Sequence, residues 1–465
     1  MKTLAKLLFA AALVLPLFVT DAAAQSTKQQ IEELQEQIRQ LQQQNQQQIQ
    51  QLQQQVQTLQ NAQQQSDQTL SQINQKQVES EDAWYNKFMA KYDSGFVFES
   101  TDKAGMPFKM KFGILAQIQG YVNDTDDENV ATNFRLRRLE LSWSGIAFAP
   151  WFYYKFMIDP TSSQLMKDMY FTAQYVNTIG PRIGQWKVPF NKEELQSSSA
   201  LQLVERSIVN EQFSLERDRG FTLQGALGAH NNFSYAVGIF NGDGINGTSV
   251  DSNMLYVGRI QLGLGGDGDD KFDANGTYAT AKDYGLTPNF AKAPTFVIGA
   301  GGSTLPGLNC DVKEPNGGAC DRIAALEMGT DVDFSQITGD IMFKMPWFNI
   351  EGEYDGRWLN PSTGGQGTAY DQGFRVQAGV FLLPKTFEFA ARYAYIDYDT
   401  SGSVVPPGVS LESSQWELTP GVNYYLSKSH KWKVQLSYSF IRNEYTQNAP
   451  DIDENIVRAQ VQANF

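Results

Sequence analysis

The sequence has 465 residues, and its 37 Lys and Arg against 51 Asp and Glu give a net charge of −14, which excludes a basic nucleic-acid-binding protein. Two His and two Cys are too few for zinc clusters of the Cys/His kind, and we expect neither a metal site nor a cofactor. Mean hydropathy is −0.39, and no apolar run reaches the roughly 18–20 residues of a membrane helix. An aromatic content of 12% beside 39 Gly instead favours many short strands and turns.

Residues 1–24 have the features of a secretory signal peptide. Lys2 and Lys6 form its positive region, residues 7–19 form an apolar stretch interrupted by Pro16, and residues 22–24 are alanines at the expected cleavage site. The apolar stretch is too short for an uncleaved membrane anchor. We therefore predict an exported protein whose mature chain begins at Gln25.

Residues 25–80 form a distinct segment with 26 Gln in 56 residues and neither Gly nor Pro. Its apolar residues recur at alternating spacings of three and four, which is the heptad pattern of a coiled coil, with a shift of frame near Asn45. The pattern predicts a helical coiled coil and therefore an oligomer; a disordered glutamine-rich linker is the alternative. The heptad positions are Ile31, Leu34, Ile38 and Leu41, followed by Ile49, Leu52, Val56 and Leu59.

Beyond a linker and barrel entry at residues 81–107, the apolar period changes to two, which is typical of strands. In residues 432–442, for example, Val434, Leu436 and Tyr438 alternate with polar residues. Residues 108–465 contain sixteen such segments. They begin near residues 108, 132, 151, 167, 181, 221, 233, 255, 295, 331, 347, 373, 386, 415, 432 and 455.

The connections between these segments are of two kinds. Tight turns are expected near Pro346, Pro384 and His430, whereas residues 191–220, 265–294, 302–330 and 398–414 form long loops. Short turns on one side and long loops on the other are typical of an outer-membrane barrel. The sequence therefore predicts an all-β fold, a 16-stranded antiparallel transmembrane β-barrel preceded by an α-helical coiled coil. A soluble sandwich is disfavoured because no domain break follows Ser80, and the terminal Phe465 resembles an assembly signal of bacterial outer-membrane proteins.

Several motifs of the barrel segment resemble the phosphate-selective porin O and P family. The most specific is the block Ile183–Phe190, which reads IGQWKVPF, and the Arg-Asp-Arg-Gly run at 217–220 follows it. The Arg-rich strand 134–141, Asp159, the Phe-Asn-Gly run at 240–242 and the Ala-Arg-Tyr run at 391–393 also match. The resemblance covers roughly residues 95–465.

This resemblance implies a homotrimeric, sixteen-stranded pore in the bacterial outer membrane. A long loop of such a pore folds into the lumen, and basic residues there attract anions; the 191–220 connection occupies the matching place. The partners implied are outer-membrane lipid and small hydrophilic solutes, anions among them, and no nucleic acid. The coiled coil is expected on the periplasmic side.

A water-filled lumen needs polar residues on the inward faces of the strands. Inward acids are expected at Glu351, Glu353, Asp355, Glu388 and Glu417, and Gln185 is expected inward as well; opposite charges that only pair across the wall are the alternative role. Strict alternation places Arg135 and Arg137 on one face with Leu139 and Leu141. The candidates for the pore and its constriction are Lys109, Lys111, Lys155, Lys187, Lys192, Glu193, Glu194, Glu205, Arg206, Arg217, Arg219, Arg259, Arg375, Arg392 and Arg458.

Three features of the loops are candidates for a disulfide bond, a metal site or catalysis. Cys310 and Cys320 lie in one loop of an exported protein, which predicts a disulfide bond. The Asp- and Gly-rich residues 265–270 match no calcium-binding spacing, so a solvated loop is favoured. His230 has no recognisable nucleophile partner, so the sequence predicts no enzyme.

The sequence thus predicts a channel for passive diffusion of small hydrophilic solutes, biased towards anions or phosphate. A porin for sugars or for neutral or cationic solutes is the alternative. A structural tether is a different class of function, because 56 helical residues would span about 84 Å.

Overall fold

The computed structural model shows one helical and one all-β unit. The first comprises residues 1–83 and the second residues 84–465, and each is described by itself. The predicted signal peptide, His230 and residues 266–270 lie outside the described residues, apart from residues 21–24 of the signal. The structure describes residues 21–78, 87–101, 105–126, 130–228, 232–248, 251–265, 294–311, 318–329, 331–362, 367–401, 410–446 and 449–465.

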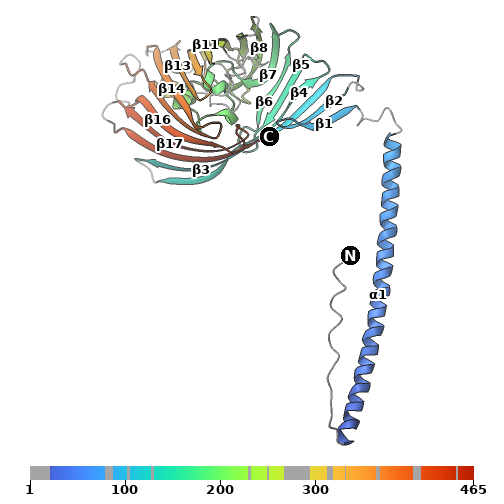
Figure 1. Cartoon of the computed structure of the whole chain (residues 1–465). Helices are drawn as coiled ribbons and strands as arrows, with labels where there is room; N and C mark the ends of the chain where they lie inside the picture. Colours follow the sequence, from blue (N-terminus) through green and yellow to red (C-terminus); the bar gives the residue numbers. More distant parts are fainter. Residues whose placement is uncertain are drawn as a thin grey trace. The chain divides into compact units, whose positions relative to one another are not determined.

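The glutamine-rich segment forms a single α-helix, α1 (Asp21–Val78), which also includes the last four residues of the predicted signal (Figure 1). Gln, Leu and Glu are good helix formers, and no Gly or Pro interrupts them. Leu34, Leu41, Leu52 and Leu59 of the heptad pattern are more than half exposed in the single chain. In the part of the chain that the structure describes, no helix is both long and apolar enough to cross a membrane.

The second unit is a closed barrel of sixteen antiparallel strands, β3 to β18, as predicted (Figure 1). Each strand pairs with its neighbour in sequence, and β18 closes the ring on β3 from Glu454 opposite Thr125 to Asn464 opposite Leu115. The strands are β3 (Phe108–Thr125), β4 (Ala131–Ala147), β5 (Phe152–Ile158), β6 (Met166–Ala173), β7 (Gly180–Lys187), β8 (Arg217–Leu227), β9 (Phe233–Phe240), β10 (Leu255–Gly265), β11 (Thr295–Leu308), β12 (Val332–Lys344), β13 (Phe348–Pro361), β14 (Ala369–Leu383), β15 (Phe387–Asp397), β16 (Glu412–Tyr425), β17 (Trp432–Tyr445) and β18 (Ile452–Asn464).

The predicted strand starts agree closely with the observed ones. The largest differences are four residues, at β8 (predicted 221, observed 217) and at β14 (predicted 373, observed 369). The agreement arises because one face of each strand is apolar and exposed while the other is polar. In β17, for example, Leu436 is 48% exposed whereas its neighbour Gln435 is 1% exposed.

A hairpin missing from the prediction precedes the barrel. Part of the segment expected as a linker forms β1 (Phe88–Tyr92) and β2 (Phe96–Ser100). β2 pairs with the first residues of β3, from Phe96 opposite Phe112 to Glu99 opposite Lys109. β2 and β18 therefore share one edge of β3, because β4 occupies the other edge along its length.

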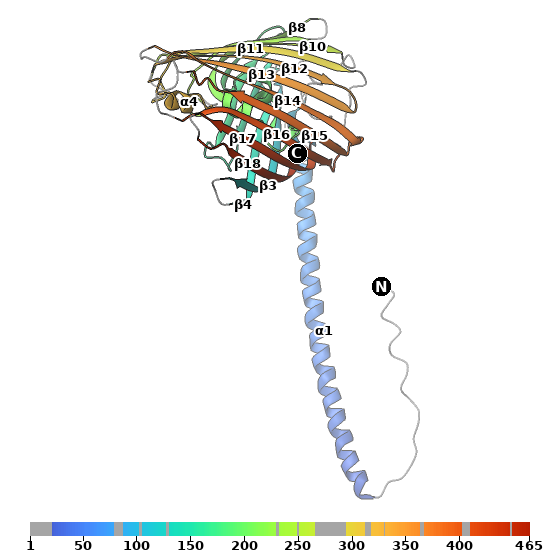
Figure 2. The same cartoon turned by 90° about the vertical axis from the view of Figure 1, so that its left-hand side faces the viewer.

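We call the end of the barrel that carries the start of β3 and the C-terminus the proximal end, and the opposite end the distal end. The turns at 345–347, 384–386 and 426–431 lie at the proximal end, and the connection 188–216 and the described residues of the connections 309–331 and 398–411 lie at the distal end (Figure 2). One prediction about the loops is wrong. β10 ends and β11 begins at the proximal end, because antiparallel strands alternate in direction, so the long connection between them does not start on the side of the other three.

Candidate functional site: the inward loop and the cationic pocket

The connection between β7 and β8, residues 188–216, folds into the barrel, and we call it the inward loop (Figure 1). It contains α2 (Lys192–Leu195), a 3-10 turn η3 (Ser198–Ala200) and α3 (Ile208–Phe213). The Ser207 hydroxyl caps α3 by accepting from the Asn210 N–H at 3.1 Å. Val209 and Phe213 of α3 are fully buried, and Gly373 of β14 leaves the space that they fill.

Wall carboxylates on one side of the barrel bind the backbone of the inward loop. Glu353 of β13 accepts from the N–H groups of Lys192 and Glu193, at 2.7 and 3.1 Å. Glu417 of β16 accepts from the N–H of Ile208 at 3.0 Å. Because these acids satisfy buried N–H groups, they fix the position of the loop and do not face open water.

Cationic and amide side chains of the same wall hold carbonyl groups of the loop. Lys433 of β17 donates to the carbonyl oxygen of Leu201 at 2.7 Å. Asn423 donates to that of Gln202 at 2.8 Å, and Gln462 to that of Ser199 at 2.9 Å. The loop is thus joined to β13, β16, β17 and β18, far from β7 and β8 where it begins and ends.

Two arginines of the wall hold Glu193. The Nε of Arg375 lies 2.9 Å from one carboxylate oxygen, and Nη1 of Arg392 lies 3.5 Å from the other. Burial by itself would raise the pKa of Glu193, but Arg375 and Arg392 outweigh burial and lower it. Glu193 is therefore ionised in the folded loop.

Three arginines of β4 hold Glu205. The guanidinium nitrogens of Arg135, Arg137 and Arg138 lie 3.5, 2.6 and 3.3 Å from its carboxylate oxygens. The expectation that Arg135 and Arg137 share a face with Leu139 and Leu141 is wrong. Gln117 pairs with Arg138 and Ile118 pairs with Leu136, so Arg137 is the extra residue of a β-bulge. The bulge shifts the alternation by one position and lets all three arginines reach one carboxylate.

A pocket of about 330 Å³ remains beside the inward loop, and we call it the cationic pocket. It lies along β5 to β10 and the facing edge of the loop. Its two carboxylates are Glu140 and Asp168, and Asp168 binds Lys155 and Arg217 at 2.6 and 2.7 Å. Its six cationic residues are Lys155, Arg182, Lys187, Lys192, Arg217 and Arg259.

Three cations of the pocket contact groups outside its lining, and one of them is Lys187, whose Nζ lies 3.2 Å from the Glu194 carboxylate. Arg182 donates to the Thr172 hydroxyl at 2.9 Å, and its guanidinium lies 4.3 Å from the centroid of the Tyr170 ring. Arg259 reaches across β11 to Asp340 at 2.6 Å. This crossing requires Gly299, because a Cβ there would lie 2.6 Å from the Arg259 guanidinium.

The structure places the predicted pore residues in several different positions. Lys155, Lys187, Lys192, Arg217 and Arg259 line the cationic pocket. Glu193, Glu194, Glu205 and Arg206 belong to the inward loop, and Arg375 and Arg392 hold it. Arg458 donates to the Ser439 hydroxyl on the inner wall, and Lys109 and Lys111 lie in the part of β3 that pairs with β2.

The prediction that Arg219 and Gln185 face the lumen is wrong. They pair opposite each other on β7 and β8 and lie on the outer face, beside Met169 and Ile183, which are 41% and 60% exposed. Alternation therefore turns Arg182 inward, and the prediction missed it. Pairing of β7 with β6 ends at Gln185, so Lys187 lies beyond the regular wall and turns into the lumen.

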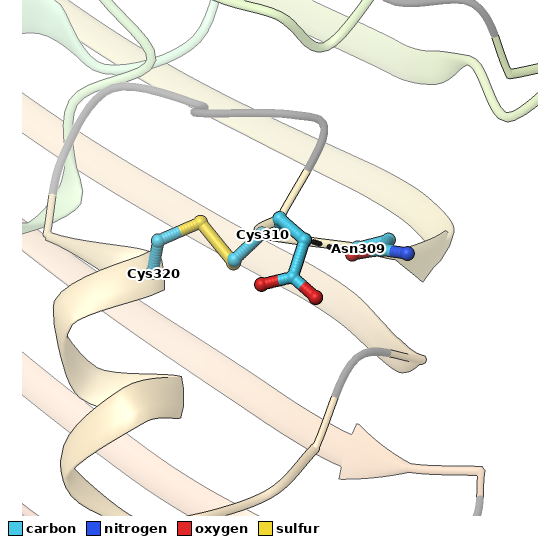
Figure 3. The surroundings of a disulfide bond; sticks show 4 residues. Asn309, Cys310 and Cys320 are labelled. Carbon is cyan, nitrogen blue, oxygen red and sulfur yellow. Dashed lines mark hydrogen bonds between the residues drawn. A yellow bond between two sulfur atoms is a disulfide. The ribbon is translucent and has the colours of Figure 1, made fainter.

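The connection between β11 and β12 also packs into the distal end of the barrel. Cys310 forms a disulfide bond with Cys320 in the first turn of α4 (Ala319–Ala325) (Figure 3). Ile323 of α4 and Leu326 are buried with Phe190 of the inward loop in one apolar cluster. Arg322 of α4 contacts Asp371 of the wall at 3.2 Å.

A closed barrel with apolar outward faces, polar inward faces and an inward loop defines an outer-membrane porin. The family model of the phosphate-selective porins O and P matches residues 108–465, and the chain belongs to this family. It is therefore a porin of the outer membrane. No curated protein matches the sequence.

Solved structures of outer-membrane proteins resemble the chain at low sequence identity. The channel DcaP of Acinetobacter baumannii is 12% identical with a TM-score of 0.47, and the alignment covers 77% of this chain and 97% of that one. OmpT of Vibrio cholerae is 10% identical with a TM-score of 0.45, covering 80% and 98%. OprB of Pseudomonas putida is 10% identical with a TM-score of 0.45, covering 77% and 94%.

Proposed function

We propose that this porin is a passive diffusion channel, not an enzyme, and that it favours small hydrophilic anions. The observation that carries the proposal is the lining of the cationic pocket, which has six cationic residues and two carboxylates. Cations along a narrow aqueous path lower the electrostatic barrier for anions and raise it for cations.

The overall charge of −14 does not oppose this proposal. Many of the acids on the inner wall are engaged elsewhere: Glu353 and Glu417 bind the backbone of the inward loop, and Glu388 accepts from Gln202, Asn423 and Tyr425. In the pocket lining the cationic side chains outnumber the carboxylates, and these lining groups, rather than the charge of the whole chain, are what a solute in the pocket meets first.

Reversal potentials in a KCl gradient across planar bilayers test the proposal. We expect the wild-type channel to favour chloride. Arg182→Gln should lower the chloride-to-potassium permeability ratio roughly two- to fivefold, because one unit charge near the path changes the ion's energy by about 1 kcal/mol. Arg442→Gln is the matched control, because Arg442 pairs with Asp453 at 2.6 Å, does not line the pocket and should leave the ratio unchanged.

Two results would reject the anion preference. One is a wild-type channel that favours potassium, and the other is an Arg182→Gln channel with the wild-type ratio. A channel without preference that is blocked by maltose would instead support the alternative of a porin for neutral solutes. Absence of discrete conducting steps would reject the channel itself.

We further propose that the porin is a homotrimer whose α1 helices form a periplasmic coiled coil. The exposed heptad residues of α1 support this, because a helix with an apolar seam gains stability by burying it against copies of itself. Light scattering of the purified protein with and without residues 25–80 tests it. The full chain should have the mass of a trimer, and the shortened chain should dissociate at lower detergent or denaturant concentration.

A further inference from the structure

The outer face of the barrel carries Arg219, which forms no ion pair with a carboxylate among the residues that the structure describes. Arg219 lies at the distal end of β8 and lines an outer pocket of about 400 Å³ with Met169, Ile183, Gln185 and Asn246. Among the residues that the structure describes, neither Nε nor Nη2 of Arg219 has a hydrogen-bond partner, although both atoms are buried. A buried guanidinium nitrogen without a partner is costly, so this pocket is suited to an anion that supplies oxygen acceptors.

An apolar groove begins directly next to this pocket. Gly220 lines the Arg219 pocket, and its neighbour Phe221 lines a groove of about 720 Å³ that crosses the outer face from β8 to β13. Gly258 of β10 and Gly302 of β11 pair opposite each other in its floor, and the side chains of Val237 and Ile337 border them. Because the two glycines have no side chains, the groove is concave between Val237 and Ile337.

Position and charge together identify the occupant. The residues that surround Arg219 and the groove include Ile183, Val237 and Tyr256, whose exposed fractions are 60%, 61% and 49%, as expected of a wall that faces hydrocarbon. A ligand that fills both the Arg219 pocket and the apolar groove needs an anionic group with oxygen acceptors at one end and a flexible apolar chain at the other. We propose that this surface binds a phosphate-bearing membrane lipid, with its phosphate at Arg219 and one acyl chain in the groove.

Native mass spectrometry of the purified full-length porin tests the proposal with two probes that have the same acyl chains. Phosphatidylglycerol carries the anionic phosphate, and diacylglycerol lacks it. We expect wild-type porin to bind phosphatidylglycerol more tightly, and Arg219→Gln to weaken this binding about tenfold, because hydrogen bonds to a charged group are lost. Binding of diacylglycerol should not change in Arg219→Gln.

The groove has its own variant. Gly258→Leu should weaken binding of both probes, because a Cβ at Gly258 meets no atom within 4 Å and the added side chain occupies the groove without a clash. Gly339→Leu on β12 is the matched control. A Cβ at Gly339 also meets no atom within 4 Å, but Gly339 does not line the groove. Arg442→Gln is the control for the charge, because Arg442 already binds Asp453 at 2.6 Å. Unchanged single-channel conductance verifies that each variant folds.

Three results would overturn the proposal. The first is Arg219→Gln porin that binds phosphatidylglycerol as tightly as wild type, or Gly258→Leu porin that binds both probes normally. The second is inorganic phosphate alone displacing the lipid at millimolar concentration, which would make Arg219 a site for free anions. The third is loss of the oligomer in Arg219→Gln with unchanged lipid binding, which would assign the guanidinium to a carboxylate of a second copy.

Discussion

The two sides of the barrel differ in height, filling and charge. β5, β6 and β7 have 7, 8 and 8 residues, whereas β12, β13 and β14 have 13, 14 and 15. The low side borders the cationic pocket, and the high side contacts the inward loop and α4. Charges on both sides contact protein groups, but those of the high side bind the inward loop and α4, whereas those of the low side also line the remaining space. The comparison teaches that position, and not the number of charges, determines which residues a solute meets.

The largest expected effect comes from acid, which acts on several carboxylates of the inward loop together. Arg137 and Arg138 lower the pKa of Glu205, and Arg206 and Lys187 lower that of Glu194 to about 2, in each case against the opposing effect of burial. The folded loop therefore favours the ionised forms. Its attachment keeps full strength above the usual glutamate pKa of 4.5 and weakens as pH falls below that value.

We therefore expect single-channel conductance to rise and become noisier between pH 4.5 and about 2, as the loop leaves the wall. The triple variant Glu193→Gln, Glu194→Gln, Glu205→Gln should already conduct in this way at neutral pH. A wild-type conductance that stays constant down to pH 2 would contradict the assignment of these acids to loop attachment.

Next in size is the effect of Glu205→Ala. It leaves Arg135, Arg137 and Arg138 without their shared carboxylate. Only Arg138 is buried with Glu205, and loss of one partner from such a buried pair costs about 3 kcal/mol. We expect a lower unfolding temperature and a larger conductance. Asp451→Asn, in the exposed connection between β17 and β18, is the control and should change neither. Wild-type stability of Glu205→Ala would show that the arginines find other partners.

The smallest of the three effects is expected from the disulfide. Replacing Cys310 and Cys320 by Ser opens a covalent loop with a sequence separation of 10, which should cost about 2–3 kcal/mol of folding stability. Because α4 packs on Phe190 of the inward loop, the same double variant should increase current noise. Thermal unfolding measures the loss of stability, and bilayer recordings with and without a reductant measure the current noise. Identical wild-type recordings with and without reductant would refute the link between the disulfide and the inward loop.

The sequence predicts the barrel well and its interior poorly, for physical reasons. A strand between lipid and water must alternate, so all sixteen strands are visible in the period of two, as in Val434, Leu436 and Tyr438. The bulge at Arg137 breaks that rule by one residue and is visible only through its pairing with β3. If the bulge is not known, Glu205 cannot be recognised as the common partner of Arg135 and Arg138.

The contacts of the inward loop depend on long-range pairing that no local pattern encodes. Lys192 meets Glu353, which is 161 positions away, and Leu201 meets Lys433, which is 232 positions away. The sequence predicts Lys192 and Glu353 as charged residues of the lumen, but their contact with each other follows only from the folded ring. Arg182 was missed because Lys187 suggested the opposite face of β7.

The shared edge of β3 has a consequence for how the barrel closes. β2 occupies this edge up to Phe112, and β18 occupies it from Leu115, with Phe465 hydrogen-bonded to Ile114 between them. If β18 shifted by two residues towards the proximal end, it would need the backbone groups of β3 that already pair with β2, up to Phe112. In the folded barrel, the hairpin is therefore incompatible with a register in which β18 extends further along β3. Because the stagger of the closing strands and their number together determine the diameter of a barrel, the hairpin is compatible with one width of the pore and opposes this alternative.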